Sequence, residues 1–255
     1  MIVCPNAKIN IGLDVLRRRP DGYHDIESLF VPVPEFRDVL EVVKADEAAL
    51  FQYGISCDVE PEKNLCFKAF RLMQEQFGIG NINIFLYKNI PMGAGLGGGS
   101  SDAAFTLLAI NEVFELGLSR EQLAALAAEL GSDCPFFVYN RPMLATGRGE
   151  ILTPFDVDLR DYQIEVVPSP DIHISTPEAY RLVDEYKRSA APDNLQDRLK
   201  MGVNKWRENV VNDFEAPVFT KYPVLAHIKK SLYDKGAVYA SMTGSGSAVY
   251  GIFAK

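Results

Sequence analysis

The sequence has few of the features that would mark a metal-binding, secreted, membrane-spanning or nucleic-acid-binding protein. The four cysteines, Cys4, Cys57, Cys66 and Cys134, lack the spacing of a metal site, so we expect reduced, buried thiols and a cytoplasmic protein. Acidic residues outnumber basic ones by 34 to 26, and the net charge of −8 argues against a nucleic-acid partner. The apolar runs stay well short of a membrane span, and the first six residues lack the basic and then apolar pattern of a signal peptide.

What the chain does have is a regular mixture of strand-like and helix-like segments. At 255 residues it can bury one large core or two modest ones. Apolar patterning predicts strands over residues 7–15, 26–33, 38–43, 81–87, 162–168, 236–242 and 247–253. Helical spacing predicts helices over residues 64–77, 102–115, 119–130, 176–187 and 222–235. This order favours an α+β fold, which a shift in composition near residues 150–155 divides into domains 1–152 and 153–255.

A glycine-rich segment is the most informative feature of the chain. It lies between a predicted strand and a predicted helix and comprises Pro91, Gly93, Gly95, Leu96, Gly97, Gly98, Gly99, Ser100 and Ser101. Glycines leave backbone N–H groups open to an anion, and Ser100, Ser101 and Asp102 are good capping residues for the helix that follows. A strand, a glycine loop and a helix N-terminus together form a phosphate-binding geometry. The segment therefore predicts a polyphosphate ligand.

Two other glycine-loop chemistries and a purely structural explanation compete with this interpretation. Gly93, Gly95 and Gly98 satisfy the dinucleotide fingerprint, but several strand-like segments precede the loop, whereas a Rossmann domain usually carries it near its start. The P-loop pattern needs a lysine where Gly99 stands. A structural loop needs only one or two glycines. The segment is explained best by a loop that binds phosphate through its backbone, with a catalytic lysine supplied from elsewhere.

Candidate catalytic side chains occur in two other places. In a strand over residues 7–15, Lys8 and Asn10 share one face, from which a lysine and an amide can reach a ligand. Taken alone, Lys8 is explained more simply as an edge-strand lysine that discourages aggregation. Asp133 lies between a helix end and an apolar run, where its carboxylate should be partly desolvated unless a cation such as Lys8 pairs with it. Asp133 could instead cap the next helical turn.

Candidate ligand-binding side chains occur near both ends of the chain. A turn signal at residues 20–22 places Tyr23 next to His24, one of three histidines. Such a pair could stack on a nucleobase and hydrogen-bond it, or simply lie on the surface. Thr243, Gly244 and Ser245 belong to a second glycine–serine turn between two predicted strands. That turn could be an ordinary hairpin, but two such loops suit a ligand that is held from both sides.

Taken in order, these motifs resemble those of the GHMP kinase superfamily, which includes galactokinase, homoserine kinase and mevalonate kinase. The glycine-rich segment resembles the superfamily's phosphate loop, and the turn at residues 243–247 resembles its C-terminal glycine motif. Four runs, at residues 7–10, 21–24, 131–137 and 212–215, more narrowly resemble the superfamily's kinases of a cytidine-diphosphate-linked methylerythritol. The resemblance spans nearly the whole chain. It implies a two-domain fold with the active site in the cleft between the domains.

The resemblance also implies an activity and a set of roles. It implies ATP-dependent phosphorylation of the 2-hydroxyl of the methylerythritol, in the non-mevalonate route to isoprenoids. Asp133 would act as the base on that hydroxyl, or only orient it, and Lys8 would contact both Asp133 and the transferring phosphate. The glycine-rich segment would hold ATP, with Mg²⁺ bridging the phosphates and no side chains dedicated to a metal. The acceptor would be held by Asn10, His24, Thr243, Gly244 and Ser245, with Tyr23 and Tyr180 on opposite faces of cytosine.

Two alternatives remain open at this point. A superfamily kinase of another alcohol is one, but Tyr23 and His24 argue against it because an alcohol without a nucleobase does not need a stacking pair. A nucleotide-binding regulator without catalysis is the other, and the presence of both Lys8 and Asp133 argues against it. The chain also ends directly after its last predicted strand, earlier than family members usually do. We therefore expect a second domain that is short at its end, with an effect on stability more than on chemistry.

Overall fold

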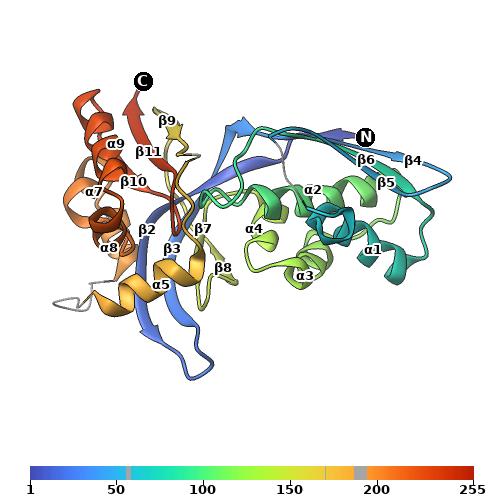
Figure 1. Ribbon diagram of the computed structural model, residues 1–255, viewed down its shortest axis with the longest axis horizontal. Coiled ribbons are helices and arrows are strands. Elements are labelled where there is room, and N and C mark those ends of the chain that lie inside the picture. The colour runs from blue at the N-terminus through green and yellow to red at the C-terminus, as the bar shows by residue number, and fades with distance from the viewer. Residues whose placement is uncertain (56–58, 170, 187–193) are drawn as a thin grey trace. The chain divides into compact units, whose positions relative to one another are not determined.

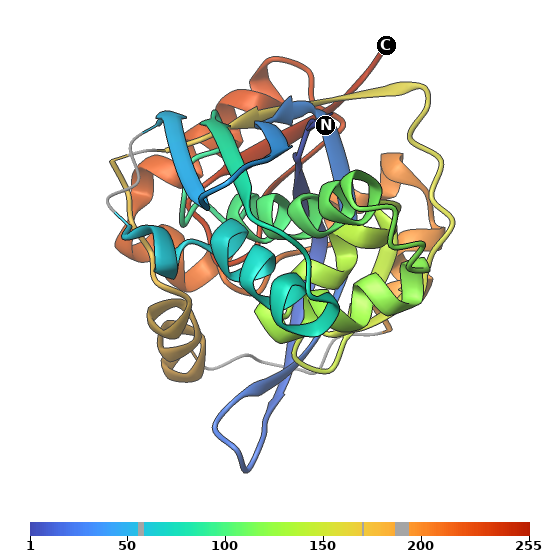
Figure 2. The same ribbon diagram turned by 90° about the vertical axis from the view of Figure 1, so that its right-hand side faces the viewer.

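The computed structural model describes residues 1–55, 59–169, 171–186 and 194–255. Runs of strands and runs of helices follow one another through this part of the chain, which forms two compact units (Figures 1 and 2). Unit 1 comprises residues 1–8, 32–92 and 97–141, and unit 2 comprises residues 9–31, 93–96 and 142–255. The residue ranges of the two units alternate along the sequence, and two long strands, β2 (Asn6–Arg18) and β3 (His24–Arg37), contribute residues to both. The expected cut at residue 152 stays a prediction about domains, and the compact units follow a different, discontinuous course.

Unit 1 is built on a four-stranded sheet with helices on one side. The strand order is β1 (Ile2–Val3), β4 (Val39–Lys44), β6 (Ile82–Lys88), β5 (Ala49–Gly54), and β5 runs parallel to β6. A 3₁₀ turn (Pro61–Lys63) leads into α1 (Leu65–Phe77), which packs beside α2 (Gly98–Val113) under the sheet. Helices α3 (Arg120–Leu130) and α4 (Cys134–Tyr139) pack on α2. Alternate residues of β4 and β6 are buried, as a half-covered sheet requires: Leu40, Val42, Ile82, Ile84 and Leu86.

The ends of these helices follow from local chemistry, with one exception to the sequence analysis. Helix α3 begins with the expected capping box, in which the hydroxyl of Ser119 accepts from the Gln122 N–H and the Gln122 side chain accepts from the Ser119 N–H. Helix α2 begins at Gly98, four residues earlier than expected, with Gly97 as its N-cap at a φ of 70° and no side-chain cap. Glycine enters this left-handed conformation without steric cost, so the chain can turn into the helix before the serines are reached. The expectation that Ser100, Ser101 and Asp102 cap the helix is therefore wrong, because all three lie inside it.

Unit 2 contains two sheets. One has the order β2, β3, β7 (Met143–Thr146), β8 (Ile151–Pro154), and the other has the order β10 (Tyr239–Met242), β11 (Val249–Ala254), β9 (Tyr162–Val167). The helices are α5 (Thr176–Glu185), α6 (Leu195–Lys200), α7 (Val203–Asn209), α8 (Glu215–Lys221) and α9 (Pro223–Asp234). Helix α9 packs on β10 and β11, and this part of the core contains Leu225, Leu232, Met242 and Val249. Met242 pairs with Val249, so the turn expected at residues 243–246 does join two strands, with a link that extends to residue 248.

Several sequence expectations need correction. Strands β1 and β5 and helices α6, α7 and α8 were not expected, because they are short or lack a clear apolar period. Cys66 and Cys134 are buried as expected, but Cys4 is exposed, because β1 ends at Val3 and Cys4 follows in the link to β2. Cys57 lies outside the described residues. Among the described residues, no helix is both long and apolar enough to span a membrane.

Candidate active site

Lys8 and Asp133 form an ion pair in unit 1, as the sequence analysis anticipated. The Lys8 Nζ lies 3.6 Å from the Asp133 Oδ2, and the Lys8 side chain is 5% exposed whereas that of Asp133 is 33% exposed. Burial lowers the pKa of Lys8, and the nearby carboxylate of Asp133 raises it only in part. Asp133 is the residue before α4, but its side chain makes no capping hydrogen bond. Its carboxylate is therefore paired with Lys8 instead of serving the helix.

The start of α2 lies directly beside this pair. A methyl group at Gly97 would approach the Lys8 Cγ to 3.2 Å and the Phe137 ring to 2.8 Å. The first hydrogen bond of the helix runs from the Ser101 N–H to the Gly97 carbonyl at 2.8 Å. By helix geometry, the N–H groups of Gly98, Gly99 and Ser100 have no acceptor inside the helix. Three backbone donors and the positive end of the helix dipole therefore stand next to the Lys8–Asp133 pair.

The glycines of the segment have packing reasons as well as a possible anion-binding role. A methyl group at Gly95 would overlap the carbonyl of Thr243, and one at Gly98 would approach the Ile90 side chain to 2.8 Å. Gly93, Gly95 and Gly97 also adopt positive φ angles. Among the glycines of this segment, Gly93 alone has space for an added methyl group, which would meet nothing within 4 Å. Close approach of other protein atoms thus explains most of the glycines in this segment. Their number alone is therefore weaker support for an anion-binding loop than the sequence suggests.

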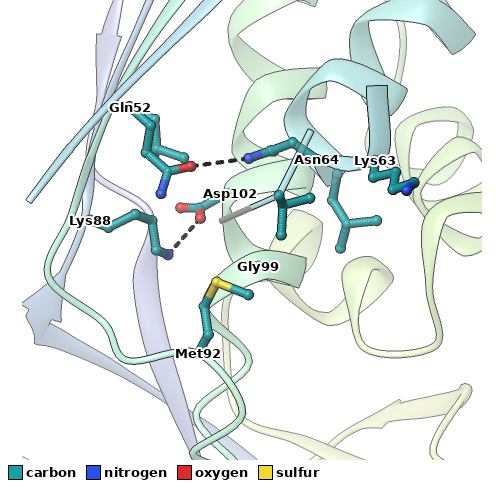
Figure 3. Close-up of a pocket in the computed structure, with 10 residues that line it drawn as sticks. Gln52, Lys63, Asn64, Lys88, Met92, Gly99 and Asp102 are labelled. Carbon is teal, nitrogen blue, oxygen red and sulfur yellow. Dashed lines mark hydrogen bonds and ion pairs between the residues drawn. The ribbon is translucent and has the colours of Figure 1, made fainter. Parts of the chain in front are cut away.

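A cavity in unit 1 opens beside the first turn of α2, and Figure 3 shows the side chains around it. Its lining combines apolar, amide and charged side chains, and the Asn64 Nδ2 donates to the Gln52 Oε1 at 3.3 Å. The lining residues are Gln52, Val59, Lys63, Asn64, Leu65, Leu86, Lys88, Met92, Gly99 and Asp102. Of these, the sequence analysis assigned a ligand role only to Gly99. The others come from β5, β6, α1, α2 and the links next to them, and no short motif connects those parts of the chain.

Two of the lining residues belong to a buried ionic cluster that the sequence analysis missed. Lys88, at the end of β6, donates to the Asp102 Oδ2 at 2.7 Å and also to Asp38, and all three residues are at most 3% exposed. Two carboxylates raise the pKa of Lys88 even though burial opposes this. Burial, with Asp38 nearby, raises the pKa of Asp102 to about 7, although Lys88 lowers it. The cluster therefore holds its protons tightly. We call these three residues the Asp38–Lys88–Asp102 cluster.

In unit 2, Asn10, Gly95 and Thr243, which come from distant parts of the chain, lie together. The Thr243 hydroxyl accepts from the Asn10 N–H at 3.1 Å and lies 3.2 Å from the Asn10 Oδ1 and 3.1 Å from the Gly95 carbonyl. The Asn10 Nδ2 also donates to the Ser28 hydroxyl at 2.9 Å. A methyl group at Gly244 would approach the Gly95 Cα to 3.3 Å. The two glycine motifs of the sequence are therefore in direct backbone contact.

The expected nucleobase-binding residues also lie in unit 2, in an arrangement that the sequence did not indicate. The His24 ring is buried, its Nε2 lies 2.8 Å from the Asp184 Oδ1, and it stacks on Tyr180. Tyr23 is 56% exposed, and the Arg148 guanidinium lies over its ring at 4.9 Å. Asp184 and Arg148 were not anticipated. The expected placement of Tyr23 and Tyr180 on opposite faces of cytosine stays a prediction. In this structure, Tyr180 is stacked on His24.

The remaining expected residues have simple environments. Leu96 is buried, Pro91 is partly buried, and the Ser245 hydroxyl lies 3.5 Å from that of Thr176. The Ser101 hydroxyl, in the first turns of α2, is buried and has no hydrogen-bond partner within the part of the chain that the structure describes. In that same part, no group of three or more histidine, cysteine, aspartate or glutamate side chains is placed to hold a metal ion.

Family models match both halves of the chain. The model described as the GHMP kinases N terminal domain matches residues 64–141, which include the glycine-rich segment, α2 and Asp133. The model described as GHMP kinases C terminal matches residues 198–255, which include the turn at Thr243.

Full-length relatives are similar over the whole chain. A 4-diphosphocytidyl-2-C-methyl-D-erythritol kinase of Parabacteroides distasonis is 48% identical over 256 residues, covering 100% of this chain and 92% of that protein. The corresponding kinase of Bacteroides thetaiotaomicron is also 48% identical, over 257 residues, covering 99% of this chain and 92% of its own length. A crystal structure of 4-(cytidine 5'-diphospho)-2C-methyl-D-erythritol kinase superposes with a TM-score of 0.82 at 35% identity, covering 98% of this chain and 89% of that one.

Proposed function

Because the chain belongs to the GHMP kinase superfamily and to its 4-diphosphocytidyl-2-C-methyl-D-erythritol kinases, we propose specific roles for its residues in that reaction. The chain transfers a phosphoryl group from ATP to the 2-hydroxyl of 4-diphosphocytidyl-2-C-methyl-D-erythritol, a step of the non-mevalonate route to isoprenoid precursors. Phosphoryl transfer depends mainly on positioning and on charge stabilisation at the developing oxygens. The residues of this chain must supply both.

The observation that carries our assignment is the pair of Lys8 and Asp133 beside the N-terminus of α2. The Asp133 carboxylate, one-third exposed and not used as a cap, accepts the proton of the attacking hydroxyl or orients that hydroxyl. The Lys8 ammonium, 3.6 Å away, stabilises the charge on the transferring phosphoryl group and on the carboxylate. Because Lys8 is buried, its ammonium is poorly solvated; this lowers its pKa and, when it is charged, strengthens its action on charge that develops near it.

The N-terminus of α2 and the cavity beside it form the nucleotide side of the proposed site. The N–H groups of Gly98, Gly99 and Ser100 point away from the helix and suit the phosphates of ATP. Pro91, Gly93, Gly95, Leu96 and Gly97 shape the approach to them. The adjoining cavity, with Leu65 and Leu86 as apolar surfaces and Asn64 as an amide, suits the nucleoside.

Mg²⁺ fits this site as a metal held mainly by ATP. It keeps several waters and usually takes one or two protein oxygens together with substrate phosphates. The unpartnered Ser101 hydroxyl at the start of α2 is a buried oxygen of the kind that could serve. When bound, Mg²⁺ neutralises phosphate charge.

The acceptor side of the proposed site is the group of residues around Asn10 and His24 in unit 2. Tyr23 stacks on cytosine, His24 hydrogen-bonds it, and Tyr180 orients His24. Asn10 binds the methylerythritol, while Thr243, Gly244 and Ser245 line the acceptor's path. The partner is thus a small molecule. The net charge of −8 supports a protein without a nucleic-acid partner, and we place it in the cytoplasm.

ADP release tests this proposal directly. The purified chain is incubated with Mg-ATP and, separately, with the cytidylated substrate, homoserine, galactose and mevalonate. We expect turnover with the cytidylated substrate alone. Turnover with another alcohol would keep the superfamily assignment and discard the roles of Tyr23 and His24. Silence with all four alcohols, despite ATP binding, would contradict the catalytic assignment of Lys8 and Asp133.

A further inference from the structure

The Asp38–Lys88–Asp102 cluster contacts the chain on both sides of the glycine-rich segment. On the side before it, the Asp38 Oδ1 accepts the backbone N–H of Asn89 at 2.5 Å and that of Ile90 at 2.8 Å. On the side after it, Lys88 donates to Asp102, the fifth residue of α2. One buried ammonium therefore connects the residues that enter the segment to the helix that leaves it.

Lys88 also lies against the first residue of α2. A methyl group at Gly98 would stand 3.3 Å from the Lys88 Nζ. The ammonium therefore lies close to Gly98 and occupies the space that a side chain at this position would need. Gly98 carries one of the helix N–H groups that we assign to the phosphates of ATP. Loss of the ammonium would therefore change the packing directly beside one of these donors. Donors that are already placed before the ligand arrives stabilise charge most effectively.

The electrostatics of the cluster give Lys88 one strongly preferred position. Lys88 and Asp38 are nearly inaccessible to water, and Asp102 is 3% exposed. A buried charge is tolerated only when it is paired and hydrogen-bonded, and here the ammonium is shared by two carboxylates. The Asp102 Oδ1 has no hydrogen-bond partner among the described residues, so Lys88 is the main support of that carboxylate. Removal of the ammonium would leave two buried carboxyl groups facing each other without a cation between them.

We propose that Lys88 is a positioning residue for ATP: through Asp38 and Asp102, its ammonium holds the two ends of the glycine-rich segment in the arrangement that binds the phosphates. This inference rests on the proposed function in one respect, that the anion at α2 is ATP. Lys88 acts through its two carboxylate partners and through the backbone of Asn89, Ile90 and Gly98. It takes no part in proton transfer to or from the acceptor.

The test compares nucleotide affinity with acceptor affinity in the intact chain. Lys88→Met keeps the length of the side chain and removes its charge. We expect the Kd of a non-hydrolysable ATP analogue with Mg²⁺, measured by titration calorimetry, to weaken about 10- to 100-fold. The KM of the cytidylated acceptor at saturating ATP should change less than about threefold. Lys88→Arg, which keeps a cation, should recover part of the nucleotide affinity.

A double variant separates positioning from general stability. Lys88→Met with Asp102→Asn replaces one of the two buried carboxyl groups that would otherwise compete for a proton without a cation, so thermal unfolding should return toward that of the wild type. Nucleotide affinity should stay weak, because the connection across the segment is still broken. Lys229→Met is the matched control, since the Lys229 Nζ lies 2.5 Å from the Glu215 Oε2 in unit 2, and it should leave the Kd of the nucleotide unchanged.

Two results would overturn the inference. One is a folded Lys88→Met variant, single or double, that binds the nucleotide as tightly as the wild type does. The other is an equal loss of affinity for nucleotide and acceptor, which would indicate a general structural role. Both outcomes are distinct from a failure of the proposed function, because that is judged on turnover by the unaltered chain.

Discussion

The imidazole of His24 lies flat on the ring of Tyr180, with the ring centroids 4.6 Å apart and the planes inclined by 10°. Tyr180 in turn meets the Phe214 ring edge-on at a centroid distance of 5.0 Å. The Nε2 of His24 is held by Asp184, so both the plane and the rotation of the imidazole are set. His24 is therefore part of a supported stack, and the exposed Tyr23 is the aromatic surface left for a base to cover.

Replacement of Tyr23 should affect the acceptor and spare ATP. Tyr23→Ala removes an exposed ring on which cytosine can stack, and such stacking contributes about 1–3 kcal/mol per base. We expect the KM of the cytidylated acceptor to rise about 5- to 150-fold, with the KM of ATP unchanged. Steady-state kinetics with each substrate varied in turn measure both values. Tyr53→Ala, at a tyrosine that is 55% exposed in unit 1, is the control and should change neither. An equal rise in both KM values would show that Tyr23 does not stack on the acceptor.

Replacement of Asp133 should abolish turnover without affecting nucleotide binding. Asp133→Asn keeps the size of the side chain and removes its charge, so Lys8 loses its ion-pair partner and the hydroxyl loses its acceptor. We expect kcat to fall about 10²- to 10⁴-fold. The Kd of an ATP analogue, measured by calorimetry, should stay within about threefold of the wild-type value. A parallel loss of activity and of nucleotide binding would instead identify Asp133 as structural.

A side chain at Gly97 should be harmful for two separable reasons. Gly97 has a φ of 70°, which costs an L-residue about 1–2 kcal/mol, and its methyl group would press on Phe137 and Lys8. Gly97→Ala should therefore lower thermal stability and weaken ATP binding. Gly117→Ala is the matched control, because Gly117 has a φ of 66° with open space around it. It should show the backbone cost alone, so an equal loss of ATP affinity in both variants would refute a specific role for Gly97.

The stability of the protein should depend on pH through Asp102. Its folded pKa of about 7 lies above its ordinary value of 3.8, so the folded state holds a proton that the unfolded chain has released. Between these two values the free energy of unfolding must fall as the pH rises. Asp102→Asn removes this titration and can still accept from Lys88. Urea unfolding at about pH 5 and pH 8 should show a larger decrease for the wild type than for the variant. Equal decreases would mean that Asp102 is ionised throughout.

The expected and observed sites agree where a motif carries its own geometry. Ser119 and Gln122 are three residues apart and form their capping box without help from the rest of the chain. The glycine-rich segment likewise leads from a strand into a helix, as its composition indicates. Lys8 and Asp133 are 125 positions apart, and their pairing was expected on two grounds: a desolvated carboxylate needs a cation nearby, and the family resemblance implies this contact.

The contacts that the sequence did not indicate concern residues whose partners come from other elements. The sequence indicates Asp102 as a helix cap, yet its carboxylate accepts from a buried lysine 14 positions away. Tyr180 and Asp184 are on one helix, and their contact with His24 joins residues that are about 160 positions apart. Such contacts depend on how distant segments pack, which a local pattern does not record.

The sequence by itself determined the α+β class and the phosphate-binding character of the glycine-rich segment, because capping residues, glycines and apolar periods act within a few positions of one another. The order of its motifs indicated the family through their resemblance to those of known kinases. Lys8 and Asp133, the two residues that we assign to catalysis, were also identified from the sequence. Only the tertiary structure decided what those residues touch: Lys88 beneath the first turn of α2, Thr243 against Gly95, and His24 between Tyr180 and Asp184. The physical reason is burial. Once a charge or ring is removed from water, its energy depends on the few groups that surround it, and folding brings those groups from anywhere in the chain.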